Sequence, residues 1–318
     1  MNFAMIEAAA GRLAGQARLT PLLNAPLLDA AFGKRVFVKA ECLQVTGSFK
    51  FRGAWSAVSA LPAGTRGVLA YSSGNHGQGV ALAAARHGLT AVVVMPADAP
   101  EVKIANTRSY GAEVVLYDRA TEDRDALGAA LCATRGLVLI KPFDDAQVIA
   151  GQGTVGLEIA AQAHDAGVET ADVLVCCGGG GLSAGIALAL EARAPGLRLR
   201  TVEPVGFDDM ARSLLAGERL RNAQTSGSVC DAILTPAPGE LTFPVLQRLA
   251  GPGIAVTDDQ ALQAMALAFT HLRIVLEPGG AVALAAALFA DTTDPVICVA
   301  SGGNADPALF RDALARFG

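Results

Sequence analysis

Short runs of apolar and β-branched residues alternate with alanine-rich stretches along almost all of the 318 residues. Most of these runs are continuously apolar, which is typical of strands buried on both faces of a parallel sheet. Repeated alternation of strand and helix favours an open α/β sheet with right-handed crossover connections. The expected strands are 36–39, 67–71, 91–95, 113–117, 137–140, 172–177, 197–203 and 295–300.

The expected strand 197–203 differs from the others in its pattern. Arg198 and Arg200 alternate with apolar residues there, which predicts a half-exposed or edge strand. No internal repeat or low-complexity linker interrupts the alternation, so two lobes would have to be interwoven. Helices are expected between the strands, for example at 79–87, 154–166 and 182–192.

Capping signals mark several of the expected helix ends. Gly88 and Gly167 stand where C′ glycines belong, because glycine tolerates the left-handed conformation of that position. Thr257 and Gln260 form a capping-box pattern. The apolar helix that follows them is expected to reach about Leu276.

Composition excludes several classes of protein. Apolar residues make up 52% of the chain and charged residues 17%, which excludes a disordered or coiled-coil protein. The net charge of −5 and the few aromatic residues make nucleic acid a poor partner. The uncharged stretch 173–190 contains four consecutive glycines, so it predicts a strand, a turn and a helix rather than a membrane span.

The chain is expected to be cytoplasmic. Its first eleven residues carry Glu7 and no basic segment, which argues against a signal peptide. The six cysteines show no CxxC pair, and several lie in apolar runs, where cysteine acts as a small hydrophobic residue. We therefore expect neither disulfides nor zinc. We also expect no regulatory domain after Gly318.

Four glycines, Gly178 to Gly181, separate a buried strand from a helix. Such a turn exposes several backbone N–H groups to one anion, and the helix N-terminus adds partial positive charge. Neither a Walker motif nor the dinucleotide-binding glycine spacing is present, so a phosphate monoester fits better than a dinucleotide. The alternative is a loose turn that binds no ligand.

A polar turn follows the expected strand 67–71. Ser72, Asn75, His76 and Gln78 stand there between glycines, and in open α/β sheets ligands bind beyond the carboxyl ends of strands. The alternative is an ordinary polar loop that caps the next helix, with a structural, hydrogen-bonded histidine.

Two further side chains are candidates for chemistry. Lys50 stands between Phe49 and Phe51, and an apolar wall lowers the pKa of a lysine towards nucleophilic use. The alternative is a lysine that extends to solvent. Ser301 follows the expected strand 295–300, where its hydroxyl is placed to meet a ring nitrogen, unless it is a helix-capping or turn serine.

Taken together, these motifs resemble those of the serine/threonine dehydratase and serine racemase family, pyridoxal 5′-phosphate (PLP) enzymes with a tryptophan-synthase-β-like fold. The resemblance covers essentially the whole chain and rests on residues 46–54, 72–78, 178–181 and 301–304. It implies an α/β fold of two interwoven lobes, each an open, mostly parallel twisted sheet flanked by helices (PLP fold type II). The implied domains are a large PLP-binding domain, 1–66 with 145–318, and a small substrate-loop domain, 67–144.

The resemblance also implies roles for individual residues toward the cofactor. Lys50 would hold PLP as a Schiff base, and Phe49 would pack against its ring. Asn75 would hydrogen-bond the phenolic oxygen, and Gly178 to Gly181 would hold the phosphate. Ser301 would meet the pyridine nitrogen, which it cannot hold in the protonated form as a carboxylate does, and this weaker electron sink suits β-elimination.

The substrate side of the site is implied in the same way. Thr235 would lie near the substrate, in place of a serine often found in the family. The turn at 230–232 reads Cys-Asp-Ala where the family usually has Ala-Asp-Gly, so its route around the cofactor is expected to differ. The substrate carboxylate would be bound by the loop that contains Ser72, Ser73, Asn75, His76 and Gln78.

A metal site is the last implied feature. Glu203 and Asp209 flank a turn after the expected strand 197–203, and with the carbonyl of Phe207 they match the metal-binding pattern of racemase-like members. Carboxylates and carbonyls suit a hard cation such as Mg²⁺. The alternative is two solvated acids.

The resulting hypothesis is an ammonia-lyase (dehydratase) that eliminates water from serine, threonine or 3-hydroxyaspartate to give a 2-oxo acid and ammonia. Lys50 would remove the α-proton. Arg124 is a candidate partner for the second carboxylate of 3-hydroxyaspartate, unless it is a solvated helix arginine. A small-molecule amino acid is the expected ligand and a homodimer the expected assembly.

Two other functions stay open. In a serine racemase, Ser73 would reprotonate the α-carbon on the face opposite Lys50, and pure dehydratases often carry alanine there. A non-catalytic ligand sensor on this fold is the alternative from another class, although a sensor needs no Schiff-base lysine.

Overall fold

The computed structural model describes residues 1–72, 74–99, 101–118 and 120–318. It contains a six-stranded sheet in the order β1-β2-β10-β7-β8-β9 and a four-stranded sheet in the order β5-β4-β3-β6. All neighbouring strands are parallel except β1 and β2. The strands are β1 (Leu22–Asn24), β2 (Val36–Lys39), β3 (Gly67–Tyr71), β4 (Thr90–Pro96), β5 (Glu113–Tyr117), β6 (Leu137–Leu139), β7 (Ala171–Cys176), β8 (Leu197–Pro204), β9 (Ile254–Val256) and β10 (Val296–Val299).

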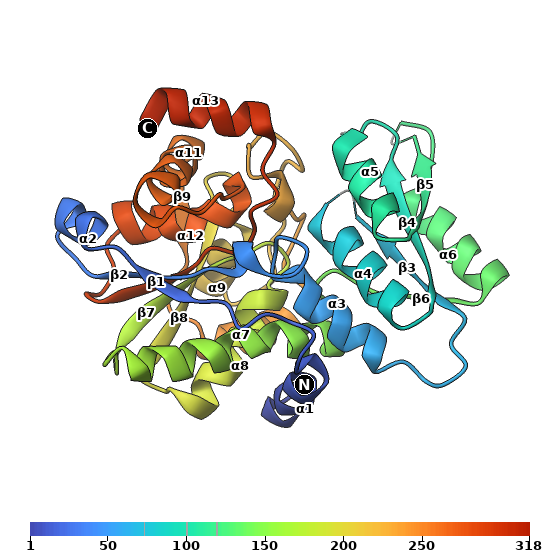
Figure 1. Cartoon of the computed structure of the whole chain (residues 1–318), viewed down its shortest axis with the longest axis horizontal. Helices are drawn as coiled ribbons and strands as arrows, with labels where there is room; N and C mark the ends of the chain where they lie inside the picture. The colour runs from blue at the N-terminus through green and yellow to red at the C-terminus, as the bar shows by residue number, and fades with distance from the viewer. Residues whose placement is uncertain (73, 100, 119) are drawn as a thin grey trace.

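Helices cover both sheets, and the two sheets form two lobes side by side (Figure 1). Among the described residues, no helix is both long and apolar enough to cross a membrane. The helices are α1 (Phe3–Leu13), α2 (Pro26–Phe32), η1 (Glu41–Leu43), α3 (Lys50–Ser59), α4 (Asn75–Arg86), α5 (Glu101–Ser109), α6 (Arg124–Arg135), α7 (Ala146–Asp165), α8 (Gly181–Arg193), α9 (Asp209–Ala216), η2 (Asp231–Ile233), α10 (Thr242–Leu249), α11 (Asp258–Leu267), η3 (Ala268–Leu272), α12 (Pro278–Phe289) and α13 (Pro307–Phe317).

Every strand expected from the sequence is confirmed to within one residue at each end. The edge position expected for 197–203 is wrong, because β8 lies between β7 and the unpredicted strand β9. Three residues are too few to show a period, and for this reason β9 and β1 escaped prediction. The expected partial exposure is confirmed, since Arg198 is exposed and pairs with Asp172 at 2.8 Å.

Helix ends were harder to predict. Helix α7 begins at Ala146 rather than at 154, because its glycines serve close packing and do not break the helix; a Cβ atom on Gly151 would lie 2.4 Å from the Arg52 carbonyl oxygen. The capping box of Thr257 and Gln260 is confirmed. Its helix stops short of Leu276, because a π-helical turn ends at Arg273, whose φ of 61° is left-handed.

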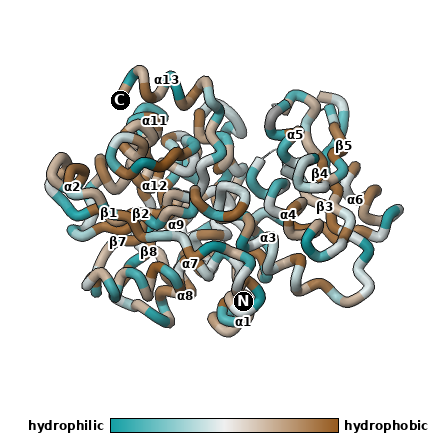
Figure 2. The backbone as a smooth tube through the Cα atoms, in the orientation of Figure 1, coloured by the Kyte–Doolittle hydropathy of each residue, from teal (hydrophilic) through white to brown (hydrophobic). Residues whose placement is uncertain are grey.

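The four-stranded sheet and its helices lie within the range predicted for the small domain, and the exact boundaries stay a prediction. Figure 2 shows hydrophobic residues concentrated in the strands of both lobes. Helix α3 joins the lobes: Lys50 begins it beside the large sheet, whereas Phe51 and Trp55 pack into the core of the small lobe. Gly79 of α4 packs on the backbone of Lys50, where a Cβ atom would lie 3.3 Å from the Lys50 carbonyl.

A cluster of buried charges holds α3 to the large lobe. The Arg52 guanidinium, 1% exposed, donates to both oxygens of Glu41 at 2.8 Å and to both oxygens of Glu158 at 2.7 and 2.9 Å. Lys39 donates to Glu158 at 2.6 Å and to the carbonyl of Thr20 at 2.6 Å. Two positive and two negative groups thus neutralise one another directly behind the first turn of the Lys50 helix.

Replacing Arg52 tests the weight of this cluster. Arg52→Met is expected to lower the free energy of unfolding by about 3–5 kcal/mol, because it leaves the Glu41 carboxylate buried without its cation. Arg52→Lys is expected to recover only part of the loss, since an ammonium group cannot contact both carboxylates with paired hydrogen bonds. Urea denaturation measures both changes.

Arg316→Met is the matched control. It removes an exposed ion pair with Asp259 at 2.7 Å, whose loss is expected to cost less than about 1 kcal/mol. Equal losses for Arg52→Met and Arg316→Met would contradict the structural importance of the buried cluster.

Candidate functional site

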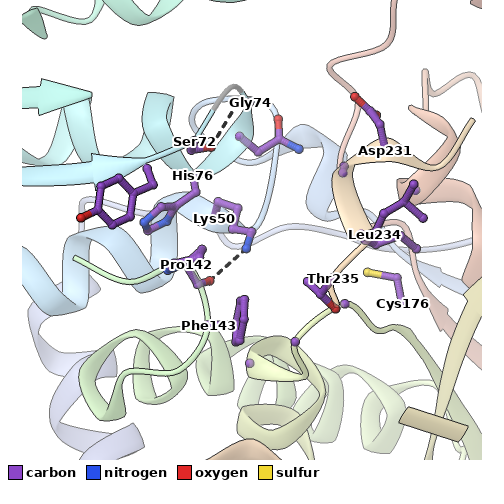
Figure 3. A pocket seen from close by; sticks show the side chains of 18 of the residues that line it. Lys50, Ser72, Gly74, His76, Pro142, Phe143, Cys176, Asp231, Leu234 and Thr235 are labelled. Atoms are coloured by element: carbon purple, nitrogen blue, oxygen red, sulfur yellow. Dashed lines mark hydrogen bonds between the residues drawn. The ribbon is translucent and has the colours of Figure 1, made fainter. Parts of the chain in front are cut away.

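A cavity of about 460 Å³ lies between the two lobes, beyond the carboxyl ends of β3, β7 and β10 (Figure 3). Its volume falls in the range of small-molecule sites. The structure brings together residues from all four predicted motifs around it. The predicted site residues that line the cavity are Phe49, Lys50, Ser72, Asn75, His76, Gln78, Arg124, Gly178, Gly179, Gly180, Gly181, Thr235 and Ser301.

Lys50 extends into this cavity from the first turn of α3. Its Nζ donates a hydrogen bond to the carbonyl oxygen of Pro142 at 3.0 Å (Figure 3) and lies 5.2 Å from the centre of the Phe49 ring. Desolvation by burial lowers the pKa of Lys50 to about 8. About a tenth of the amine is therefore uncharged at pH 7, far more than for an ordinary lysine, and a nucleophile or base requires this form.

Neighbouring side chains lie so close to the glycine loop at the start of α8 that a residue with a Cβ atom would not fit there. Cβ atoms would lie 2.2 Å from the Phe143 ring at Gly179 and 2.9 Å from Met210 Cε at Gly180. Gly180 also has a φ of 89°. The first N–H groups of α8 have no partner within the helix, and residues 178–182 line the cavity. The loop therefore fits an anion such as a phosphate group.

Gln152 supplies a second sign that this loop holds a ligand. It lies on α7 and is 1% exposed, and both atoms of its side-chain amide lack a hydrogen-bond partner among the described residues. Its Oε1 approaches Gly181 so closely that a Cβ atom there would lie 2.7 Å away. Buried amides are rarely left unpaired, so this one fits a polar ligand at the loop.

Asn75, at the first position of α4, is fixed by side chains of the large lobe. Its Nδ2 donates to Glu277 Oε1 at 2.5 Å, and its Oδ1 accepts from Asn304 Nδ2 at 2.7 Å. Asn304 also donates to the carbonyl of Thr46 at 2.9 Å. An amide nitrogen has two N–H donors, so one N–H of Asn75 is left for a ligand.

The loop before α4 offers backbone donors more than side chains. His76 Nε2 lies 2.8 Å from the Ile140 carbonyl oxygen, while burial and the nearby Lys50 lower the pKa of His76 to about 3. The imidazole is therefore neutral and committed to Ile140. The Ser72 hydroxyl accepts from the Gly74 N–H at 3.1 Å. The unpaired N–H groups of the first turn of α4 are the remaining donors for a carboxylate. Ser73 lies outside the described residues.

Two cations from the small lobe line the mouth of the cavity. Lys103 Nζ reaches across to Asp231 Oδ2 on the large lobe at 3.3 Å. The Arg124 guanidinium lies 5.1 Å from the centre of the Tyr71 ring and pairs with Asp125 at 3.2 Å. Arg124 thus begins α6 at the cavity mouth, and its position leaves both predicted roles open, substrate partner and solvated residue.

Thr235 lies deeper, next to the glycine loop. Its Oγ1 is buried and unpaired among the described residues, and its Cγ2 would be 3.2 Å from a Cβ atom on Gly178. The carbonyl of Thr235 accepts from Asn222 Nδ2 at 2.9 Å, and the same amide donates to Asp209 at 2.6 Å. Asn222 thus connects the cavity wall at Thr235 with Asp209 of the predicted metal site.

That corner lies outside the cavity, at the carboxyl end of β8. Glu203 is fully buried and accepts from the Met210 and Ala211 N–H groups at 2.9 and 2.8 Å. Burial, with the nearby Asp209, raises the pKa of Glu203, and burial raises that of Asp209 to about 6. Asp209 Oδ2 has no partner among the described residues. Two adjacent buried carboxylates and the Phe207 carbonyl in the turn between them fit a hard cation.

Histidine and cysteine add nothing to this corner. Across the described parts of the chain, no group of three or more His, Cys, Asp or Glu side chains gathers as metal ligands. A cation at Glu203 and Asp209 would therefore depend on the Phe207 carbonyl and on water for its remaining ligands.

Comparison with known proteins assigns the chain to a family. The family model of pyridoxal-phosphate dependent enzymes matches residues 13–302. The chain belongs to this family. An L-threo-3-hydroxyaspartate ammonia-lyase from Pseudomonas sp is 40% identical over 96% of both chains.

Two solved structures agree with this assignment. The threonine deaminase of T.th. has a TM-score of 0.90 and 46% identity, covering 96% of this chain and 99% of that one. The serine racemase of maize has a TM-score of 0.90 and 34% identity, covering 99% and 97%. The resemblance to serine/threonine dehydratases and serine racemases is thereby confirmed, and the two sheets are those of PLP fold type II. The protein is a PLP-dependent enzyme.

Several cavity residues of this PLP enzyme escaped prediction. Glu277 precedes Pro278 and a helix, which indicates only a helix start. Gln152 lies within a helix between two glycines, and Lys103 lies on a polar helix with no distinctive pattern. Cys176 was interpreted as a core residue, yet it lines the cavity. Only the tertiary arrangement shows that these side chains meet.

Glu277 gives a testable pH dependence in the cofactor-free chain. The pKa of Glu277 is raised from 4.5 to about 7, mainly because the carboxyl group is buried. The hydrogen bond from Asn75 lowers the pKa, the negative charge of Asp231 raises it, and the positive charges of Lys103 and Lys50 lower it. Because the folded pKa lies above the unfolded one, the stability linked to Glu277 is complete below about pH 4.5 and is lost as pH rises through 7. The total change is expected to be about 3 kcal/mol.

Denaturation of the wild type and of Glu277→Gln at pH 4.5 to 8 measures this loss, because the variant cannot ionise at this position. As pH rises, the unfolding free energy of the wild type is expected to fall relative to that of Glu277→Gln. Glu240→Gln, at an exposed ion pair, is the control and is expected to show no such trend. A constant difference for Glu277→Gln would contradict the raised pKa.

Proposed function

We propose that this PLP enzyme is an ammonia-lyase that removes water from a β-hydroxy amino acid and yields a 2-oxo acid and ammonia. The observation that carries the proposal is Lys50, an amine of lowered pKa that lines the same cavity as the glycine loop. The relatives named as ammonia-lyase and deaminase support it. Serine, threonine and 3-hydroxyaspartate are the proposed substrates.

The residues proposed to hold the cofactor surround the cavity on several sides. PLP supplies a carbonyl carbon that bonds to an amino group and a ring that withdraws electrons from the substrate α-carbon. The glycine loop, with the free amide of Gln152, is proposed to bind the phosphate. Phe49 would contact the ring, the free N–H of Asn75 the phenolic oxygen, Ser301 the ring nitrogen and Lys50 the carbonyl carbon.

Lys50 is also the proposed base. With a pKa of about 8, its Nζ accepts a proton from the α-carbon without first having to lose one at mildly alkaline pH. The carbonyl of Pro142 holds Nζ in one direction, which orients the amine for this transfer. The neutral His76 nearby adds no positive charge that would lower the basicity of Lys50 further.

The substrate carboxylate is proposed to bind at the N-terminus of α4. Its free N–H groups and helix dipole favour an anion there. Thr235 is proposed to contact the substrate side chain with its unpaired hydroxyl. Arg124 would bind the second carboxylate if the substrate is 3-hydroxyaspartate. Ser72 and Ser73 of the preceding loop, with Asn75, His76 and Gln78 of the first turn of α4, are the residues proposed to surround the carboxylate.

Three further features are proposed from the family resemblance. Glu203, Asp209 and the Phe207 carbonyl would bind Mg²⁺ or a similar cation, which the unpaired Asp209 Oδ2 supports. The protein would be cytoplasmic, and it would form a homodimer.

A serine racemase is the second candidate function. The maize and rice serine racemases support it, at 34% and 35% identity. The presence of Ser73 in the sequence also favours it, because inversion needs a proton donor on each face of the α-carbon.

One assay tests both functions. The holoenzyme is incubated with serine, threonine and the isomers of 3-hydroxyaspartate, and oxo acid and inverted amino acid are measured separately. Lys50→Ala is expected to lower both activities by at least about 10²–10⁴-fold, because the base is lost. Lys141→Ala, an exposed lysine nearby, is the control and is expected to keep both. Ser73→Ala is expected to remove inversion and spare elimination.

Formation of no oxo acid from any of these substrates would refute the lyase, and absence of inverted serine would refute the racemase. A Lys50→Ala variant as active as the wild type would show that another lysine holds the cofactor.

The metal proposal is tested by thermal unfolding. Mg²⁺ at 100 times its Kd is expected to stabilise the protein by about 2.7 kcal/mol, and a chelator is expected to reverse this. Asp209→Asn is expected to lose the response. The control Asp208→Asn, which alters a half-exposed neighbour paired with Arg212, is expected to keep it. A wild type that ignores both cation and chelator would contradict the site.

A further inference from the structure

A thiol lies beside the hydroxyl that is proposed to meet the cofactor ring. Cys176 ends β7, is 3% exposed and lines the cavity (Figure 3). Its Sγ donates a hydrogen bond to Ser301 Oγ at 3.2 Å. Ser301 follows β10, which pairs with β7 in the sheet. Two adjacent buried strands therefore fix the contact from both sides.

The direction of this hydrogen bond decides what Ser301 can do. A hydroxyl has one donor and two acceptor sites, and here it accepts from the thiol. Ser301 Oγ donates to no acceptor among the described residues, so its proton is free for a ligand. An S–H group is a weak donor and sulfur a weak acceptor, whereas a ring nitrogen is a stronger acceptor for the Ser301 proton, so a ligand nitrogen favours the arrangement in which Cys176 donates to Ser301. Burial raises the pKa of Cys176 to about 11, so the thiol keeps its proton at neutral pH.

We infer that Cys176 is a positioning residue that holds the Ser301 hydroxyl as a hydrogen-bond donor into the cavity. The inference rests on the proposed function, in which Ser301 meets the ring nitrogen. A nitrogen that accepts this hydrogen bond stays unprotonated. Without the thiol, the hydroxyl is free to rotate and to accept a hydrogen bond from a protonated nitrogen instead. Cys176 thus acts through Ser301 on the electron-withdrawing strength of the cofactor.

The first experiment uses holoenzyme loaded with PLP labelled with nitrogen-15 in the ring. Cys176→Ala is expected to move the ring-nitrogen NMR shift toward that of a protonated nitrogen. It is also expected to weaken PLP binding about 2- to 10-fold, the effect of one ordinary hydrogen bond. Cys176→Ser keeps a donor and is expected to restore both values. The control Cys298→Ala removes a buried thiol of β10 that does not line the cavity and is expected to leave the shift unchanged.

A second measurement does not depend on a folded Cys176 variant. The S–H stretching band of Cys176 reports whether its proton is hydrogen-bonded. In the Ser301→Ala holoenzyme, infrared spectroscopy is expected to show one S–H band moved to the frequency of a free thiol. An unchanged set of bands would overturn the inference.

The outcomes separate this inference from the proposed function. If Ser301→Ala changes the ring-nitrogen shift and Cys176→Ala does not, Ser301 meets the ring without help from Cys176, and only the inference fails. If neither variant changes it, the proposed Ser301 contact fails, and the inference fails with it. A loss of PLP binding in Cys176→Ala that Cys176→Ser does not repair indicates a packing role and also overturns the inference.

Discussion

One side-chain amide, that of Asn75, links the two lobes at the site. Its nitrogen is held by Glu277 and its oxygen by Asn304, both from the large lobe, while its backbone starts α4 of the small lobe. The N-terminus of α4 is thereby held at the cavity that Lys50 also lines. Because both polar ends of the amide are used, a rotation of Asn75 would break two hydrogen bonds between the lobes.

The charged groups of the molecule are arranged in two different ways. Behind α3, Arg52 and Lys39 are fully paired with buried carboxylates, so that cluster is neutral and rigid. Inside the cavity, Lys50, His76 and Glu277 have no opposite charge as a hydrogen-bond partner: Lys50 bonds a carbonyl and has a lowered pKa, His76 is uncharged, and Glu277 bonds an amide and has a raised pKa. A neutral cluster behind α3 thus supports a cavity in which the pKa values of Lys50 and Glu277 lie near neutral pH, an arrangement suited to proton transfer.

The sequence predicted the strands and the four motifs that meet at the cavity because both depend on local patterns. Continuous apolar runs predict buried strands, and polar or glycine-rich turns after such strands meet at one edge in a parallel arrangement. Side chains without a local pattern could not be placed. Gln152 stands in a helix and Cys176 in an apolar strand, and only the packing of α7 and of β10 turns them to the cavity. The edge position of β8 was mispredicted for the same reason, because its partner β9 is too short to be recognised.

The order of strands in the large sheet determines when during synthesis this site can assemble. Strand β10 lies between β2 and β7, although β2 ends at Lys39 and β10 begins at Val296. While the chain emerges from the ribosome, β2 has no partner on that side until β10 has been synthesised. Pairings so distant in sequence form slowly and leave strand edges exposed meanwhile. Ser301 lies just beyond β10, so a nascent chain cannot complete the cavity before this strand and Ser301 have been translated.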